Sequence, residues 1–256
     1  NPFWYRKDRD LAAKIVQVQN EKLAELCASK PDRFGAFASL ALQFPDLAVQ
    51  QLEHAVKKLG LKGAAIGGSV AGQDFHMEKF HPVWAKAEEL GCVLFIHPQS
   101  TPQLNDRFKG NGWLANTIGN PLDTTIALQH LIFEGTLDKF PGLKICGAHG
   151  GGYLPSYMGR TDAQCNRQSD ACGGKKRPVE DYFRTQLMAD IMVFRDEGLR
   201  HLVAEMGVGQ LVYGTDMPFP WPVNPDFILN ARFLDNTQKE QILSGNLVRL
   251  LKLGPA

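Results

Sequence analysis

The chain has 256 residues, of which 44% are hydrophobic and 21% are charged, and its formal net charge is +1. This composition is that of an ordinary globular protein with enough apolar residues for a sizeable core. The balanced charge argues against a nucleic-acid surface, and no apolar run approaches the ~20 residues of a membrane span. We therefore expect neither nucleic acid nor a membrane among its partners.

The five cysteines are scattered along the chain and odd in number. No pair has the C-x-x-C spacing of a structural zinc site. Cys92 and Cys146 lie at or inside apolar runs, where a free cysteine behaves as a small hydrophobic residue. These features predict reduced thiols and a cytoplasmic protein.

Short apolar runs alternate with helical patterns along the chain. In chain order, the patterns predict a strand at 33–40, a helix at 45–59, a strand at 61–68, a helix at 82–90, a strand at 92–98, a loop at 99–120, a helix at 122–134, a strand at 143–149, a helix ending near Arg160, a loop at 162–180, a strand at 183–190, a helix at 196–206, a strand at 210–216, an irregular proline-rich segment at 217–225, and helices at 226–234 and 237–252.

The six predicted strands are each followed by a helix, which indicates parallel strands with right-handed crossovers. The unbroken apolar run at 93–96 is typical of a strand that is buried on both faces. Six units suit a doubly wound open sheet or a barrel. His97, His149 and Asp216 each close a strand, and strand ends converge on one mouth only in a barrel. We expect a single (β/α)8 TIM-type barrel domain over 1–256.

Each of the three strand-end residues has features that suit a functional site. An imidazole directly after a buried strand needs a partner, and zinc is a frequent one. His149 precedes three glycines, which let the backbone pass close to a ligand. A carboxylate such as Asp216 is costly at the end of a buried strand unless it is paired or bound to a metal. Alone, each could be structural, but together they favour a divalent metal: zinc first, with manganese or iron as alternatives.

The His-Gly-Gly-Gly segment also resembles the oxyanion-hole segment of lipases. That interpretation requires a G-x-S-x-G nucleophile segment, and the nearest match, at 67–71, lacks the final glycine and lies on the wrong side of His149. A serine hydrolase is therefore disfavoured. Asp190 closes the predicted strand at 183–190 and is a weaker site candidate. Aromatic loop residues are candidates for pocket walls: Trp113, Phe219 and Trp221.

Five segments together carry a family resemblance: FIHP at 95–98, NPLDTTIALQHLIFEGTLDKFPGLKI at 120–145, HGGGYLPSYMGR at 149–160, YGTDMPFP at 213–220 and SGNLVRLL at 244–251. The combination resembles the amidohydrolase-related family. Within it, the chain is most similar to the branch that contains 2-amino-3-carboxymuconate 6-semialdehyde decarboxylase.

The resemblance implies roles where residues match. His97 and Asp216 would be metal ligands, and His149 the catalytic acid/base beside the metal. Arg160 would bind a substrate carboxylate in the neighbouring subunit of a homodimer, a role that suits the planar guanidinium. Arg167 is a weaker second candidate.

One departure stands against this match. The family carries a His-x-His pair on its first strand, and no H-x-H occurs in this sequence. If the strand of Asp216 is the eighth, the strand at 33–40 is the third. We therefore expect an N-terminally incomplete barrel that lacks its first two β/α units.

The preferred function is metal-dependent, non-oxidative decarboxylation of a small unsaturated or aromatic carboxylic acid. One alternative is a metal-dependent hydrolase or hydratase that uses the same site. Another is a non-catalytic barrel, which follows if the missing His-x-His pair prevents metal binding.

Overall fold

The computed structural model describes residues 3–99 and 101–254. Five parallel strands form one sheet in chain order, and these are β1 (Gly63–Ile66), β2 (Val93–Ile96), β3 (Lys144–Gly147), β4 (Leu187–Asp190) and β5 (Leu211–Val212). Each strand lies within a predicted strand. The sixth prediction, at 33–40, is reduced to one parallel bridge between Ala38 and Ala64, which extends the sheet beside β1.

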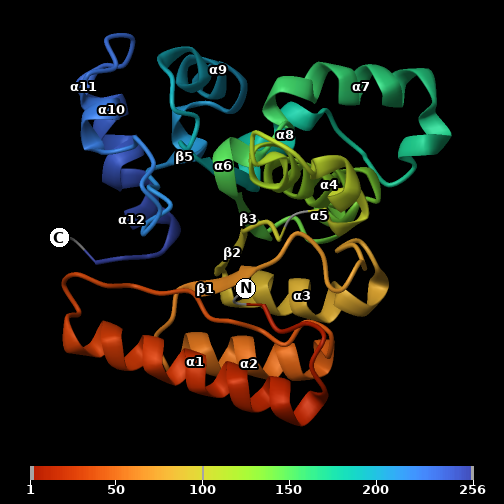
Figure 1. Cartoon of the computed structure of the whole chain (residues 1–256), viewed down its shortest axis with the longest axis vertical. Coiled ribbons are helices and arrows are strands. Elements are labelled where there is room, and N and C mark those ends of the chain that lie inside the picture. The colour runs from red at the N-terminus through yellow and green to blue at the C-terminus, as the bar shows by residue number, and fades with distance from the viewer. Residues whose placement is uncertain (1–2, 100, 255–256) are drawn as a thin grey trace.

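Helices connect the strands and surround the sheet (Figure 1). They are α1 (Arg9–Ser29), α2 (Pro45–Lys57), α3 (His81–Leu90), α4 (Asn120–Phe133), α5 (Thr136–Lys139), α6 (Ala148–Gly151), α7 (Met158–Arg167), α8 (Val179–Thr185), α9 (Asp196–Met206), α10 (Pro225–Leu229), α11 (Asn236–Glu240) and α12 (Asn246–Leu250). Helices α1 and α2 lie side by side along one border of the molecule, and α7 lies at the opposite border. Among the described residues, none of these helices combines the length and apolar character that crossing a lipid bilayer requires.

Both faces of the sheet are buried, as the apolar run at 93–96 predicts. Alternate residues such as Leu94, Ile96 and Ile145 pack under the surrounding helices in the main core. The residues between them form a second apolar cluster on the other face, where Val93 and Cys146 pack with Leu250 of α12. This period of two is what the alternating direction of strand side chains dictates. The second face lines the cavity described below.

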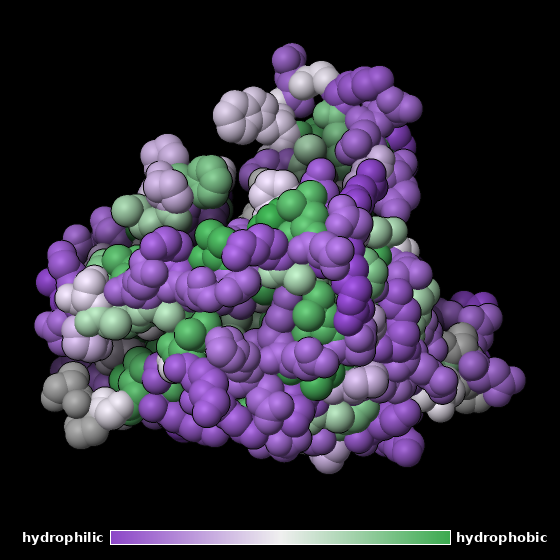
Figure 2. Space-filling model, turned by 90° about the horizontal axis from the view of Figure 1, so that it is seen from below, coloured by the Kyte–Doolittle hydropathy of each residue, from purple (hydrophilic) through white to green (hydrophobic). Residues whose placement is uncertain are grey.

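Further segments depart from the sequence prediction. Helix α1 was not predicted, because its apolar residues do not share one face, and three of them stay exposed: Leu11, Val18 and Leu26. Figure 2 shows the molecule from the side of α1 and α2, where hydrophilic residues surround smaller hydrophobic areas. In the predicted strand at 183–190, the chain stays helical to Thr185, and pairing begins at Leu187.

The predicted loop at 162–180 is also wrong in part. Helix α7 continues to Arg167, and a disulfide joins Cys165 to Cys172 across the following turn, with 5.4 Å between the two Cα atoms. The expectation of reduced thiols is therefore wrong for this pair, because the helix end brings together two residues that are only seven positions apart. The other three cysteines are free. The cytoplasmic location stays a prediction.

The aromatic packing around Trp84 generates a first test of the fold. Trp84 on α3 is fully buried between Phe75 and Phe80, and its Nε1–H donates to the Phe75 carbonyl at 2.9 Å. Replacing it by alanine leaves a large cavity, so we expect Trp84→Ala to lower the free energy of unfolding by about 3–5 kcal/mol in urea denaturation. Trp113→Ala is the control, since that side chain is 81% exposed and its loss is expected to change stability by about 0.5 kcal/mol or less. Equal effects of the two substitutions would contradict the packing.

Candidate active site

His97, His149 and Asp216 lie together at the carboxyl ends of β2, β3 and β5, as the sequence predicts. The His97 Nε2 atom lies 3.9 Å from Asp216 Oδ1, and the His149 Nε2 atom lies 3.8 Å from Asp216 Oδ2. The two imidazole rings meet edge to face, with 5.3 Å between their centroids. One carboxylate is thus shared by two imidazoles.

His97 is held by the end of its strand. Its backbone N–H donates to the Ile66 carbonyl at 2.8 Å, which continues the pairing of β1 with β2. Its Nδ1 atom lies 3.2 Å from the Pro98 carbonyl, and a carbonyl can only accept, so Nδ1 carries the proton. The Nε2 lone pair then faces Asp216. Burial, together with the neighbouring His149, lowers the pKa of His97 and favours the neutral form that can bind a metal.

His149 lies in a left-handed turn that the buried carboxylate of Asp190 stabilises. Its φ is 57°, and Gly150, Gly151 and Gly152 also have positive φ, which explains why glycines follow this histidine. The Asp190 carboxylate accepts the backbone N–H groups of His149, Gly150 and Met192 at 2.9–3.0 Å. Asp190 therefore lies at the mouth, as predicted, with its oxygens engaged by the backbone.

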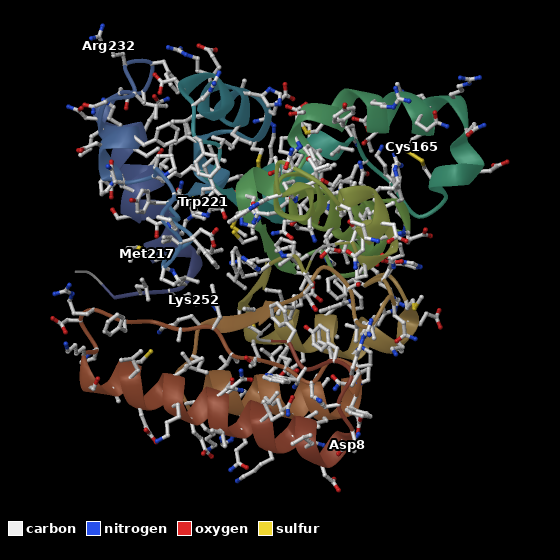
Figure 3. All side chains as sticks on the ribbon, in the orientation of Figure 1. Asp8, Cys165, Met217, Trp221, Arg232 and Lys252 are labelled. Carbon is white, nitrogen blue, oxygen red and sulfur yellow. A yellow bond between two sulfur atoms is a disulfide. The ribbon has the colours of Figure 1, made fainter. Side chains whose placement is uncertain are left out.

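Asp216 is oriented by a tryptophan. The Trp221 Nε1–H donates to Asp216 Oδ2 at 2.7 Å, and the Trp221 ring lies against Phe194. Figure 3 shows Trp221 on the chain between β5 and α10. From the sequence, Trp221 was expected only as a pocket wall. Its indole N–H was the missed signal, because an indole N–H that is partly buried needs an acceptor.

The spacing of the three side chains fits a shared cation better than mutual hydrogen bonding. The contacts of 3.8 and 3.9 Å are too long for hydrogen bonds, and one ligand atom of each residue lies within 4.8 Å of the others. Ligands at the usual 2.0–2.2 Å from a zinc-like ion lie about 3.3 Å apart, so small rotations would close the site. Two imidazoles and a carboxylate are the donor types that such an ion prefers.

A largely apolar cavity of about 680 Å³ opens beside these three residues. Its walls come from the inner face of the sheet, from the loop after β5 and from α12, and include Phe37, Val93, Phe95, Val212, Phe219 and Leu247. Cys146 also lines it, but burial raises the pKa of this thiol far above its usual range, so it stays protonated. The cavity therefore suits a small molecule with a largely apolar surface.

The aromatic residues and arginines predicted as further site candidates differ in their distance from the cavity lining: some line it and others do not. Phe219 lines the cavity, whereas Trp113 is exposed and lies outside it. Arg160 and Arg167 lie on α7, exposed and away from the residues that line the cavity.

Asp123, which no sequence pattern indicated, holds the loop that follows His97. Its Oδ2 accepts the Gln99 backbone N–H at 2.8 Å, and the carboxylate lies against Gly68, where no Cβ would fit. Burial raises the pKa of Asp123 to about 6. Its position in the first turn of α4 resembles an ordinary helix-start residue, so the pattern gave no signal of this contact.

Comparison with known proteins gives the family. Residues 6–253 match the amidohydrolase family model. The chain belongs to the amidohydrolase family. The 2-amino-3-carboxymuconate-6-semialdehyde decarboxylase of Dictyostelium discoideum is 32% identical over 254 residues, which cover 98% of this chain and 70% of that protein. The γ-resorcylate decarboxylase of Rhizobium radiobacter is 32% identical over 257 residues, which cover 96% and 78%. The resemblance inferred from the motifs is confirmed.

A solved structure supports the fold. A dihydroxybenzoic acid decarboxylase from Polaromonas, crystallised with manganese and the inhibitor 2-nitroresorcinol, superposes with a TM-score of 0.89 at 29% identity. The match covers 98% of this chain and 79% of that chain. The predicted α/β fold class, a barrel of parallel strands, is confirmed.

Asp190 provides a test of how the His149 turn is held. An amide offers one acceptor oxygen and places an NH₂ group against backbone donors, so Asp190→Asn breaks at least one of three buried hydrogen bonds. We expect the free energy of unfolding to fall by about 3 kcal/mol in urea denaturation. Asp106→Asn is the matched control, because that carboxylate is 93% exposed and should change stability by about 0.5 kcal/mol or less. A stable Asp190→Asn protein would contradict this role.

Proposed function

We propose that the chain is a metal-dependent decarboxylase that removes CO₂ without oxidation from a small unsaturated or aromatic carboxylic acid. The observation that carries the proposal is the convergence of His97, His149 and Asp216 beside an apolar cavity of about 680 Å³. The relatives named for decarboxylation of such acids support the same chemistry.

His97 and Asp216 are the proposed metal ligands. The neutral imidazole of His97 and the carboxylate of Asp216 suit zinc, while the solved relative with bound manganese makes that ion the alternative. When bound by His97 and Asp216, such an ion would supply a Lewis acid that polarises the substrate.

His149 is the proposed proton donor. In decarboxylation the bond between the carboxyl carbon and its neighbour breaks, CO₂ leaves, and the electron pair spreads into the conjugated system of the substrate. A proton must then reach that carbon, and the imidazolium form of His149 delivers it. The left-handed turn held by Asp190 fixes His149 on the side of Asp216, so the donor and the ligand act on the same region of the cavity.

The apolar walls contribute to the same step. A carboxylate loses its charge as it becomes CO₂, so surroundings such as Phe95, Val93 and Val212 destabilise the charged reactant more than the products. Hydrolysis or hydration would not benefit from this difference. The cavity chemistry thus favours decarboxylation over the hydrolase and hydratase alternative.

Arg160 is proposed to bind a substrate carboxylate in the partner subunit of a homodimer. Among the described residues its side chain makes no hydrogen bond or ion pair, and Arg160 is exposed on α7. A free guanidinium on a surface suits a role across a subunit contact, where it can bind a carboxylate through two parallel hydrogen bonds.

His149→Asn tests the chemistry. Asparagine tolerates the left-handed backbone at φ 57° better than alanine, and it cannot act as an acid or base at neutral pH. We expect kcat to fall by about 100-fold to 10,000-fold while bound metal, measured by mass spectrometry, is retained. His201→Asn, on the exposed face of α9, should leave both unchanged.

The product assay decides between the alternatives. Release of CO₂ from a conjugated carboxylic acid supports the proposal, whereas ring opening or hydration without CO₂ favours the hydrolase or hydratase. A full-length protein without stoichiometric metal or turnover would support the non-catalytic barrel. Unchanged turnover in His149→Asn with metal retained would remove His149 from its role.

The trans role of Arg160 has its own test. Arg160→Ala should raise KM by about 10-fold to 100-fold, because a charge-assisted contact is lost, whereas Arg167→Ala on the same helix should not. Mixing Arg160→Ala chains with His149→Asn chains should restore about a quarter of wild-type activity, since half of the dimers then hold one intact site. No recovery on mixing would place the arginine in its own subunit or outside the site.

A further inference from the structure

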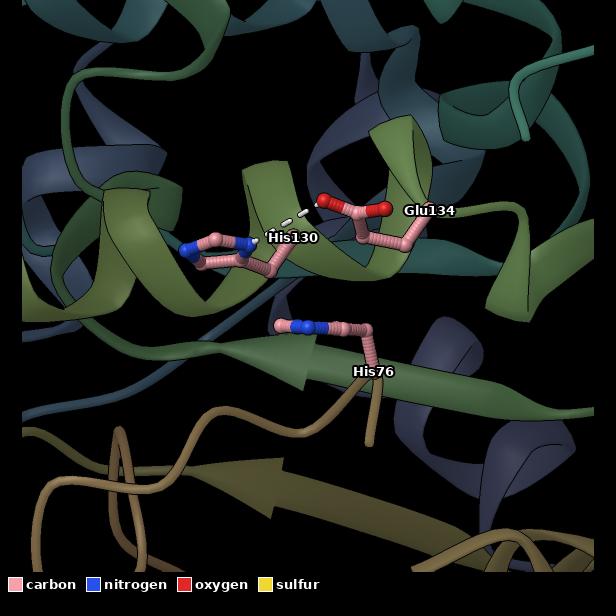
Figure 4. Close-up of side chains that lie close together, drawn as sticks. All are labelled: His76, His130 and Glu134. Carbon is pink, nitrogen blue, oxygen red and sulfur yellow. Dashed lines mark ion pairs between the residues drawn. The ribbon is translucent and has the colours of Figure 1, made fainter. Parts of the chain in front are cut away.

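A second group of potential ligands lies outside the active site. Asp74 and His76 come from the loop after β1, while His130 lies in the last turn of α4 and Glu134 caps the end of that helix. Figure 4 shows His130 and Glu134 at the same helix end, with His76 across from them. None of the four residues lines the active-site cavity.

Three of these side chains are spaced as ligands of one cation. One ligand atom from each of His76, His130 and Glu134 lies within 4.8 Å of the others. The His130 Nδ1 atom lies 3.8 Å from Glu134 Oε1, a separation too long for a hydrogen bond. The spacing of four residues, across the last turn of α4 and its cap, places both groups on one side, so a single ion can bind both.

His76 lies over His130 without a polar partner for one of its nitrogens. The two rings stack with 4.7 Å between their centroids and 24° between their planes. The His76 Nδ1 atom is buried and has no hydrogen-bond partner among the described residues. A buried, unpaired nitrogen is costly. A cation bound to this nitrogen removes the cost, because it takes up the lone pair.

Asp74 completes the arrangement from the other side of His130. Its Oδ2 atom lies 3.5 Å from His130 Nε2, the ring nitrogen that does not face Glu134. Histidines that bind metals usually donate their other N–H to a carboxylate, which fixes the ring and strengthens the ligand. Asp74 is placed for that role.

The backbone of His76 is itself anchored. The His81 Nε2–H donates to the His76 carbonyl at 3.1 Å, and the Lys139 ammonium donates to His81 Nδ1 at 2.9 Å. Through His81, these contacts connect the loop to Lys139 at the end of α5.

We propose that His76, His130 and Glu134 form a second binding site for a zinc-type divalent ion, with Asp74 orienting His130. Binding requires side-chain rotations that bring the ligand atoms from at most 4.8 Å to about 3.3 Å apart, the spacing set by metal–ligand bonds of 2.0–2.2 Å. Water fills any remaining position on the exposed side of Glu134.

An ion bound at this site connects the loop after β1, through His76, to α4, through His130. The same helix carries Asp123, whose carboxylate holds the loop that follows His97. The second site therefore stabilises the frame of the active site from outside the barrel and takes no part in the reaction.

Glu134→Gln tests the site, because this exposed side chain can lose its charge without disturbing the core. Zinc binding is measured by calorimetry on chelator-treated protein in which Asp216→Asn has removed a ligand of the proposed active site. We expect Glu134→Gln to raise the Kd for zinc about tenfold or more. Glu205→Gln is the matched control, since Glu205 lies four residues after His201, with 4.0 Å between Glu205 Oε1 and His201 Nδ1. Among the described residues, no third potential ligand is grouped with that pair.

The measured zinc affinities distinguish a specific second site from nonspecific surface binding. A Kd raised by Glu134→Gln and unchanged by Glu205→Gln, with one zinc per chain lost in His76→Ala/His130→Ala, supports the site. Unchanged affinity in Glu134→Gln, or equal losses in both glutamate variants, overturns it in favour of nonspecific surface binding. Because Asp216→Asn is present throughout, the result does not depend on whether the active-site proposal holds. Circular dichroism of each variant checks that it is folded.

Discussion

The buried carboxylate of Asp190 is the constraint on which the active site depends. It accepts three backbone N–H groups from two different segments, so it joins the end of β4 to the turn after β3. A left-handed backbone is costly for a residue other than glycine, and the hydrogen bonds to Asp190 offset this cost at His149. The direction of the His149 side chain, and with it the distance to Asp216, follows from a backbone interaction one strand away.

Both faces of the sheet are apolar, and the polar side chains of the site lie at one edge. Side chains of the outer face pack under the helices, while the inner face is apolar and lines the cavity. The polar residues His97, His149 and Asp216 lie at the carboxyl edge. There the strands end, so backbone groups no longer pair within the sheet and can bind side chains. The site therefore has polar groups on one side and apolar walls on the other, which suits a reaction in which a carboxylate loses its charge.

Sequence patterns predicted the elements whose side chains have a clear period. Helix α2 and strand β2 are examples, because burial of one helix face or of both strand faces leaves a regular apolar pattern. Helix α1 lacked such a pattern and was missed. The disulfide between Cys165 and Cys172 was missed as well, since the intervening chain was predicted to be a loop with no fixed geometry.

The sequence by itself determined that His97, His149 and Asp216 lie at the same edge of a parallel sheet, because each follows an apolar strand run. It also determined the family, through segments that are contiguous in the chain. Only the tertiary structure decided that Trp221 orients Asp216, that Asp190 supports His149, and that His76 meets His130 and Glu134. These contacts join segments through side-chain direction and loop path, which no local periodicity encodes.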